Sequence, residues 1–113
     1  MIGKIVKVII DRPLGTYHPK HKDIYYSVNY GYIEGIMASD GEYQDAYVLG
    51  VDKPIKEFVG EVKAIIHRFD DIEEKWVVAP KELTLSKEEI IKEVNFQEKY
   101  FKISIKMEVN VNG

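Results

Sequence analysis

The sequence predicts a mainly β protein: a small antiparallel β-barrel with one α-helix near the C-terminus and an extra C-terminal strand. Three observations support this prediction. Short apolar runs rich in strand-forming residues are separated by turn residues. One segment after Ser86 has the pattern of a capped helix, and the tail from Phe101 to Val111 alternates apolar and polar side chains. With 113 residues, the chain is expected to form a single domain over residues 1–113.

Short strands are expected along the first two thirds of the chain. The run from Lys4 to Ile10 is rich in Ile and Val and stops at the turn sequence DRPLG. A basic loop is expected at TYHPKHKD, followed by short, bent strands in IYYSVNYGYIEGI, which two glycines interrupt. Further strands are expected at AYVLGV, EVKAIIHRF and WVVAP, the last two forming a hairpin. In the second of these, Val62, Ala64 and Ile66 are expected to share one face.

The C-terminal third predicts the helix and the extra strand. Ser86 and Glu89 have the spacing of a capping box, and the good helix formers of KEEIIKEVNFQEKY follow. From Phe101 to Val111, apolar residues then alternate with Lys, Ser, Lys, Glu and Asn. This period of two predicts a half-buried strand that closes or extends the barrel.

Composition excludes several classes of function. The net charge of -3 argues against nucleic acid as the main partner, because neutralising phosphates needs a basic surface. The chain has no cysteine, so a metal would be held by oxygen or imidazole. The N-terminus alternates too strongly for a signal peptide, and no apolar run reaches membrane-spanning length. We therefore expect a cytoplasmic protein without a membrane partner.

Two acidic clusters allow two interpretations. The stretch SDGEYQDAYVL contains Asp40, Glu42 and Asp45, and DDIEEK contains a second group that includes Asp70 and Glu73. Asp-Gly is a strong turn signal, so the carboxylates can simply solvate hairpin turns. Clustered carboxylates are also the ligands that Mg²⁺ or Mn²⁺ prefers. Composition alone favours the turns.

The order of the motifs favours the metal site. YYSVNYGYIEG followed by SDGEYQDAYVLGV resembles the soluble (family I) inorganic pyrophosphatases, which have an Asn-Tyr-Gly motif and then Asp-Gly-Asp-Pro-x-Asp before an apolar strand. AIIHRFDDIEEKWVVAP resembles the second acidic segment of that family with a shorter turn. The likeness covers Val28 to Pro80 and extends more loosely to FQEKYFK. It implies an oligonucleotide-binding-like (OB-like) barrel and an inorganic diphosphatase, which hydrolyses pyrophosphate with a metal-activated water.

The resemblance also implies roles for single residues. It implies Mg²⁺, or Mn²⁺, as cofactor, with the metal ligands Asp40, Glu42, Asp45, Asp70 and Glu73. Asp45 also matches the carboxylate that orients and deprotonates the attacking water, and Lys75 matches a phosphate-binding lysine. Asp45, Tyr30 and Lys75 are therefore the expected catalytic residues. The substrate-binding residues that it implies are Tyr26, Asn29, Tyr30, Lys75 and Tyr100.

The chain departs from the family pattern before the Asn-Tyr-Gly motif. The family has a Lys-Tyr-Glu strand and an Asp-Arg segment there, whereas DRPLGTYHPKHKDIYYSVNYG runs almost directly from the first strand into the motif. The chain is thus expected to be a shortened and divergent member. Arg12 is the expected substitute for the lost substrate-binding charge, with the basic loop beside it. His18 and His21 are expected to be exposed loop histidines, because Pro19 between them disfavours a helical ligand pair.

Two aspartates of the family are glutamates here, Glu42 and Glu73. The extra methylene moves each carboxylate by roughly 1.5 Å. Mg²⁺ demands near-octahedral geometry, so the metal set is expected to be reduced or altered. The alternative function is a non-catalytic OB-like module that binds metal or phosphate ligands. A third interpretation is an assembly protein, in which the edge of the C-terminal strand pairs with another copy to form a homo-oligomer.

Overall fold

The computed structural model describes residues 1–70 and 73–107. Over these residues the chain forms six strands and one helix: β1 (Ile5–Arg12), β2 (Asn29–Met37), β3 (Tyr43–Val48), β4 (Glu57–Arg68), β5 (Glu74–Ala79), α1 (Lys87–Glu98) and β6 (Ile103–Met107). No helix in this described part is long and apolar enough to cross a membrane.

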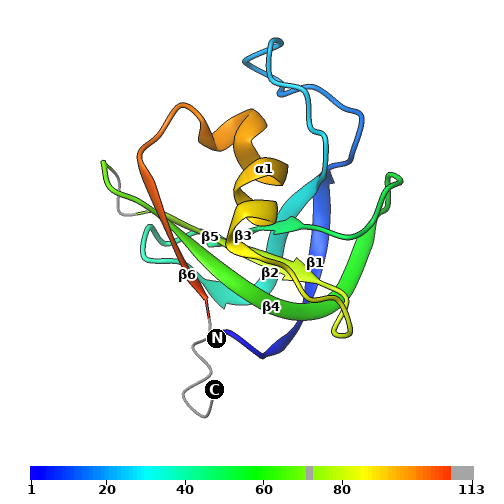
Figure 1. Cartoon of the computed structure of the whole chain (residues 1–113). Helices are drawn as coiled ribbons and strands as arrows, with labels where there is room; N and C mark the ends of the chain where they lie inside the picture. The colour runs from blue at the N-terminus through cyan, green and yellow to red at the C-terminus, as the bar shows by residue number, and fades with distance from the viewer. Residues whose placement is uncertain (71–72, 108–113) are drawn as a thin grey trace.

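The strands form a closed ring with one additional strand. The ring order is β1–β2–β3–β5–β4, and it closes because β4 also pairs with β1. β6 pairs with β4 outside the ring, and α1 lies against the barrel (Figure 1). The predicted mainly β barrel, with one helix near the C-terminus and an extra strand, is confirmed. Every pair is antiparallel except β3–β5, which is parallel because β4 lies between them in the sequence.

The core has two layers, one on each face of the central strands. On β3, Ala46 and Val48 point into the barrel, where they join a cluster with β1 and part of β4. Tyr47, with Leu49 just after the strand, lies on the opposite face, in a cluster with the helix residues Ile90 and Val94. β3 and β5 are therefore buried on both faces, which explains why AYVLGV and WVVAP are continuous apolar runs rather than alternating ones.

A β-bulge divides β4 between these two layers. Val62 pairs with Val78 and faces the barrel interior, whereas Ala64 pairs with Val77 and joins the layer under the helix. Ile66 follows Ala64 into that layer. The expectation that Val62, Ala64 and Ile66 share one face is wrong, because the extra residue of a bulge reverses the alternation.

Helix α1 begins with the predicted capping box. The Ser86 hydroxyl accepts from the Glu89 N–H at 3.1 Å, and the Glu89 carboxylate accepts from the Ser86 N–H at 2.8 Å. The last turn is unusual because it buries two polar side chains, Gln97 and Glu98. Their partners lie on the barrel, so this turn is where the helix contributes polar groups to a site.

The extra strand is present as β6, with Ile105 buried against the helix layer. Phe101 precedes β6 in a bend rather than starting the strand. Residues 108–111 of the predicted alternation lie outside the described residues.

Candidate functional site

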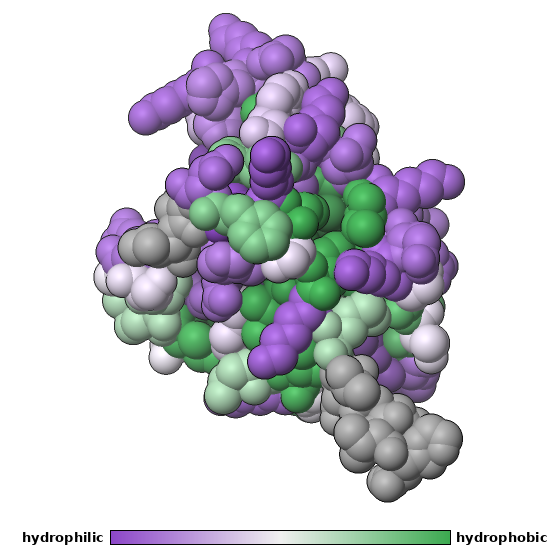
Figure 2. Space-filling view, turned by 60° about the vertical axis from the view of Figure 1, so that its left-hand side comes forward, coloured by the Kyte–Doolittle hydropathy of each residue, from purple (hydrophilic) through white to green (hydrophobic). Residues whose placement is uncertain are grey.

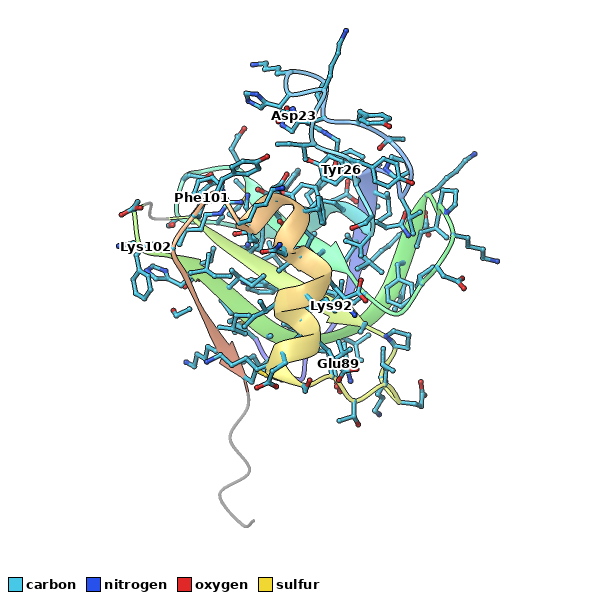
Figure 3. All side chains as sticks on the ribbon, turned by 45° about the horizontal axis from the view of Figure 1, so that its top comes forward. Asp23, Tyr26, Glu89, Lys92, Phe101 and Lys102 are labelled. Atoms are coloured by element: carbon cyan, nitrogen blue, oxygen red, sulfur yellow. The ribbon has the colours of Figure 1, made fainter. Side chains whose placement is uncertain are left out.

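One hollow is lined by five of the eleven site residues that the sequence predicts. It has a volume of about 360 Å³ and lies beside the C-terminal end of α1, under the loop that joins β1 to β2. We call it the Arg12–Lys75 pocket. Its lining residues are Asp11, Arg12, His18, His21, Tyr26, Tyr30, Asp45, Arg68, Lys75, Gln97 and Phe101. Tyr26 and Phe101, at this end of the helix, are labelled in Figure 3.

Arg12 reaches the pocket from a bulge at the end of β1. The register between β1 and β2 shifts between Ile10 and Arg12, so that Arg12 is the partner of Tyr30. The side chain is 29% exposed, and its Nη1 lies 3.5 Å from the Asp11 carboxylate. Its Nε is buried, and no acceptor among the described residues lies within hydrogen-bond distance. A buried donor without an acceptor costs about 1–3 kcal/mol.

Lys75 is the second cation of the pocket, and it is held by two carboxylates. Its Nζ donates to Asp45 at 2.6 Å and to Glu73 at 3.1 Å, and it lies 5.7 Å from the centre of the Tyr30 ring. Burial disfavours the charge, but Tyr30 and Asp45 outweigh it and raise the pKa of Lys75 above its ordinary value. Lys75 is therefore a permanent cation, suited to binding an anion and unsuited to act as a base.

The tyrosines of the pocket are neutral, and the hydroxyl proton of Tyr26 is already donated to Gln97 at 2.8 Å. Burial raises the pKa of Tyr30 well above its ordinary value, and it raises the pKa of Tyr26 as well. A buried phenol that stays protonated can donate a hydrogen bond to an anion without adding negative charge.

A buried hydrogen-bond network beneath the pocket connects α1 to the barrel. The Glu98 carboxylate accepts from Arg68 Nε at 2.9 Å, from Arg68 Nη2 at 2.6 Å and from the Tyr47 hydroxyl at 2.6 Å. Gln97 donates to the Tyr47 hydroxyl and accepts from the Tyr26 hydroxyl, both at 2.8 Å. The Arg68 guanidinium also stacks on Phe101 at 3.8 Å from the ring centre. The network fixes the orientation of the aromatic and cationic groups that line the pocket.

The structure brings six of the predicted site residues together. Arg12, Tyr26, Tyr30, Asp45 and Lys75 line the pocket, and Glu73 contacts the Lys75 ammonium. Asn29 instead connects two loops: its Oδ1 accepts a hydrogen bond from Leu14 N at 2.9 Å, and its Nδ2 donates to Lys53 O at 2.9 Å. Its side chain is fully buried, so these hydrogen bonds give Asn29 a structural role in the loops rather than a role in substrate binding.

The remaining predicted residues lie on turns outside the lining of the pocket. Asp40 and Glu42 are exposed at the β2–β3 turn, where the Asp40 carboxylate accepts from the Glu42 N–H at 3.0 Å. Asp70 is exposed in the turn after β4. Tyr100 is 54% exposed, and its neighbour Phe101 lines the pocket in its place. The turn interpretation thus describes Asp40 and Glu42 in this structure.

The described carboxylates do not form a full set of metal ligands. Across residues 1–70 and 73–107, no three acidic or histidine side chains come together as metal ligands. Asp45 and Glu73 do converge, on the Lys75 ammonium. Mg²⁺ is commonly held by one or two carboxylates together with waters and substrate phosphates. In this structure the Lys75 ammonium lies against both carboxylates of the pair.

Sequence reasoning missed several residues of the pocket. His18 and His21 lie in the loop, as expected; His21 is exposed and His18 is partly exposed, and both line the pocket. The His18 Nδ1 accepts from the backbone N–H groups of Lys20 and His21, at 3.0 and 3.2 Å, so the neutral ring carries its proton on Nε2. Asp11 lines the pocket beside Arg12, and burial, with a smaller contribution from Asp45, raises its pKa despite Arg12. Its position at the end of an apolar strand was the one available signal.

Comparisons with known proteins place the fold. No protein-family model matches the chain, and no curated protein matches its sequence. Solved structures do match. An inorganic pyrophosphatase from Ehrlichia chaffeensis is 16% identical, with 95% of this chain and 88% of that chain covered and a TM-score of 0.71.

Two further solved structures agree. An inorganic pyrophosphatase from Helicobacter pylori is 20% identical, covers 92% of this chain and 83% of its own, and has a TM-score of 0.62. One from Coxiella burnetii is 16% identical, covers 95% and 86%, and has a TM-score of 0.61. The chain therefore has a pyrophosphatase-like fold. Fold and site together define a pyrophosphatase-like barrel whose pocket is lined by cations, neutral phenols and a few carboxylates.

Proposed function

We propose that the protein binds inorganic pyrophosphate in the Arg12–Lys75 pocket and hydrolyses it to phosphate with Mg²⁺ or Mn²⁺. The observation that carries this proposal is that Arg12 and the permanent cation Lys75 line the same small hollow. A guanidinium and an ammonium facing one small hollow are the groups that bind phosphate oxygens most strongly. The pyrophosphatase-like fold supports pyrophosphate as the ligand.

The chain's own residues have distinct roles in this proposal. Arg12 and Lys75 bind phosphate oxygens, and Tyr30 donates to the anion as a neutral phenol. When Lys75 contacts phosphate, its hold on Asp45 weakens, and the Asp45 carboxylate becomes available to accept a proton from the attacking water. A bound cation would neutralise phosphate charge and lower the pKa of that water, and Asp45 and Glu73 are the residues that would hold it.

The second candidate is binding without hydrolysis. It is favoured by the exposed positions of Asp40, Glu42 and Asp70, which leave only Asp45 and Glu73 near the substrate among the predicted ligands. Pyrophosphatase chemistry neutralises a large negative charge, and fewer ligands hold fewer ions. In this alternative the pocket retains its affinity for phosphate but does not cleave the anhydride.

Calorimetry and a phosphate-release assay separate these candidates. Titration of the protein with pyrophosphate should show binding that Arg12→Gln weakens about tenfold or more, since it removes a charge-assisted contact. Lys106→Gln, a neutralisation at an exposed position of β6, is the matched control and should leave affinity unchanged. Phosphate release with Mg²⁺ or Mn²⁺ should be lost in Asp45→Asn while binding persists. Binding without release by the unmodified protein would establish the second candidate, and no binding under any condition would refute both.

A homo-oligomer is proposed on a separate observation. In the part of the chain that the structure describes, β6 has a hydrogen-bonded neighbour only on its β4 side. Figure 2 turns the side on which β6 lies toward the viewer and shows hydrophobic surface in its middle. Gel filtration of the chain truncated after Tyr100, once circular dichroism shows it folded, should give a smaller assembly than the full chain. The single domain and the cytoplasmic location remain predictions.

A further inference from the structure

A second hollow adjoins the Arg12–Lys75 pocket on the loop above it. It has a volume of about 450 Å³ and is lined by Tyr17, His18, Pro19 and Lys22. His18 lines both hollows, so a single imidazole lies between them. The loop projects from the end of the barrel at which α1 ends (Figures 1 and 3). A ligand that fills the Arg12–Lys75 pocket and extends past His18 would therefore reach this second hollow.

The loop that forms the second hollow is held by its own hydrogen bonds. Its two sides are paired by an isolated bridge between Tyr17 and Tyr25. Four backbone bonds of 2.8–2.9 Å support the bridge: Gly15 N to Tyr26 O, Tyr26 N to Thr16 O, His18 N to Ile24 O, and Ile24 N to His21 O. The hollow is thus built on ordered backbone, and its shape does not depend on a ligand.

The side chains of this hollow suit a flat ring. Tyr17 is 59% exposed, and its ring packs edge-on against Tyr25, with centroids 5.3 Å apart and planes at 66°. This contact supports the Tyr17 ring, and more than half of the residue remains exposed. His18 and Pro19 supply two further flat or apolar surfaces, and Lys22 supplies a positive charge. Stacking on an aromatic side chain contributes about 1–3 kcal/mol per nucleobase and tolerates any base.

Another hollow of the molecule lacks this combination. It has a volume of about 750 Å³ and lies beside the N-terminal half of α1, where Figure 3 labels Glu89 and Lys92. Its charged lining is mostly acidic, with Asp52, Glu89 and Glu93 against one lysine. Such a site repels phosphate. The hollow on the loop, in contrast, places an aromatic surface next to the Arg12–Lys75 pocket.

We propose that the two hollows together bind a nucleoside diphosphate, with the phosphates in the Arg12–Lys75 pocket and the base against Tyr17. This inference rests on the proposed phosphate site and names the substrate class for it. His18 lies at the junction, where its Nε2–H is placed to donate to the group that links phosphate to ring. In this proposal free pyrophosphate occupies the Arg12–Lys75 pocket and leaves the second hollow empty.

Calorimetry with three probes at fixed ionic strength tests this inference: ADP, methyl diphosphate and inorganic pyrophosphate. ADP and methyl diphosphate present the same phosphates to the pocket, and only ADP has a base. ADP is expected to bind about tenfold more tightly than methyl diphosphate, as one stacked base predicts. Tyr17→Ala should reduce ADP affinity to that of methyl diphosphate and leave pyrophosphate affinity unchanged.

Tyr43→Ala is the matched control. Tyr43 is also an exposed tyrosine that packs on a second tyrosine, Tyr32, at 5.6 Å, and it lines neither hollow. Its replacement should change no affinity. Equal binding of ADP and methyl diphosphate would overturn the inference while leaving the pyrophosphate site in place, and so would an ADP preference that survives Tyr17→Ala. Failure of all three probes to bind would overturn the proposed function as well.

Discussion

Replacing Glu98 by Gln is expected to destabilise the fold by about 3 kcal/mol, because it removes the nearest counter-charge of a buried arginine. The Glu98 side chain is 1% exposed and the Arg68 side chain 6% exposed. Burial alone would lower the pKa of Arg68, but its hydrogen bonds and charge interaction with Glu98 more than compensate and raise it. The arginine therefore stays charged in the variant, and its charge remains buried.

The magnitude follows from the contacts that are lost. The carboxylate accepts three hydrogen bonds, two of them from Arg68. A glutamine has one acceptor oxygen and directs N–H groups toward the remaining donors. Removing one partner of a buried pair costs about 3–5 kcal/mol. The lower end applies here because Arg68 keeps a second carboxylate, Glu73, at 3.5 Å.

Urea denaturation followed by circular dichroism measures this effect. Glu93→Gln is the matched control, since Glu93 is an exposed residue of the same helix and should change stability by no more than about 0.5 kcal/mol. Combining Arg68→Met with Glu98→Leu should recover part of the loss, because an apolar pair leaves no buried charge. A Glu98→Gln variant within about 1 kcal/mol of the control would refute the assignment of this pair as a buried ionic contact.

Three further predictions follow from the pocket and the barrel. Asp11→Asn should raise pyrophosphate affinity roughly threefold, because it removes a negative charge from the lining. In the unmodified protein the pKa of Asp11 is raised, mainly by burial. Pyrophosphate affinity should therefore increase as the pH falls and Asp11 is neutralised. Calorimetry of the unmodified protein and of Asp11→Asn at two pH values checks the effect of the substitution and the effect of pH. Gly31→Ala should cost at least about 3 kcal/mol in urea denaturation, because a Cβ would lie 1.8 Å from the Ile9 carbonyl oxygen; Gly35→Asn, where nothing lies within 4 Å and φ is +88°, should be tolerated. The pKa of His18 should lie below 6.5 in an NMR titration, because of burial and nearby positive charge. Since the unfolded chain then binds the proton more readily, the stability of the fold should decrease slightly as the pH falls through 6.5. A measured pKa of His18 at or above 6.5 would contradict the placement of the loop.

The fold could be predicted where the pattern is local. The capping box at Ser86 and the alternation around Ile105 depend on residues a few positions apart, and both predictions are confirmed. The bulge in β4 could not be predicted, because it arises from the pairing of Val62 and Ala64 with neighbouring positions of β5. Nothing in the apolar run itself marks the position at which the alternation reverses.

The site residues also separate into those that the sequence could place and those that it could not. Tyr30, Asp45 and Lys75 lie on paired strands, so their place in the ordered motifs also fixes their place in space. Asp40 lies on a turn, and its sequence position does not determine whether the turn directs its carboxylate to the pocket or to solvent. Arg68 was missed because its partner Glu98 is 30 residues away. Only tertiary packing brings these two together.

The pairing of Arg12 with Tyr30 has a consequence for how this binding site can change. These residues are opposite each other in the sheet, so the intervening loop leaves and rejoins the barrel at one point. The outer part of the loop, residues 17–23, can therefore vary without displacing either residue, whereas Ile24, Tyr26 and Val28 belong to the core. A loop from another barrel, inserted between Arg12 and Tyr30, would begin and end at the same two residues. In the proposed function, the strands therefore hold the groups that bind the phosphates, and the exposed part of the loop selects what is attached to them.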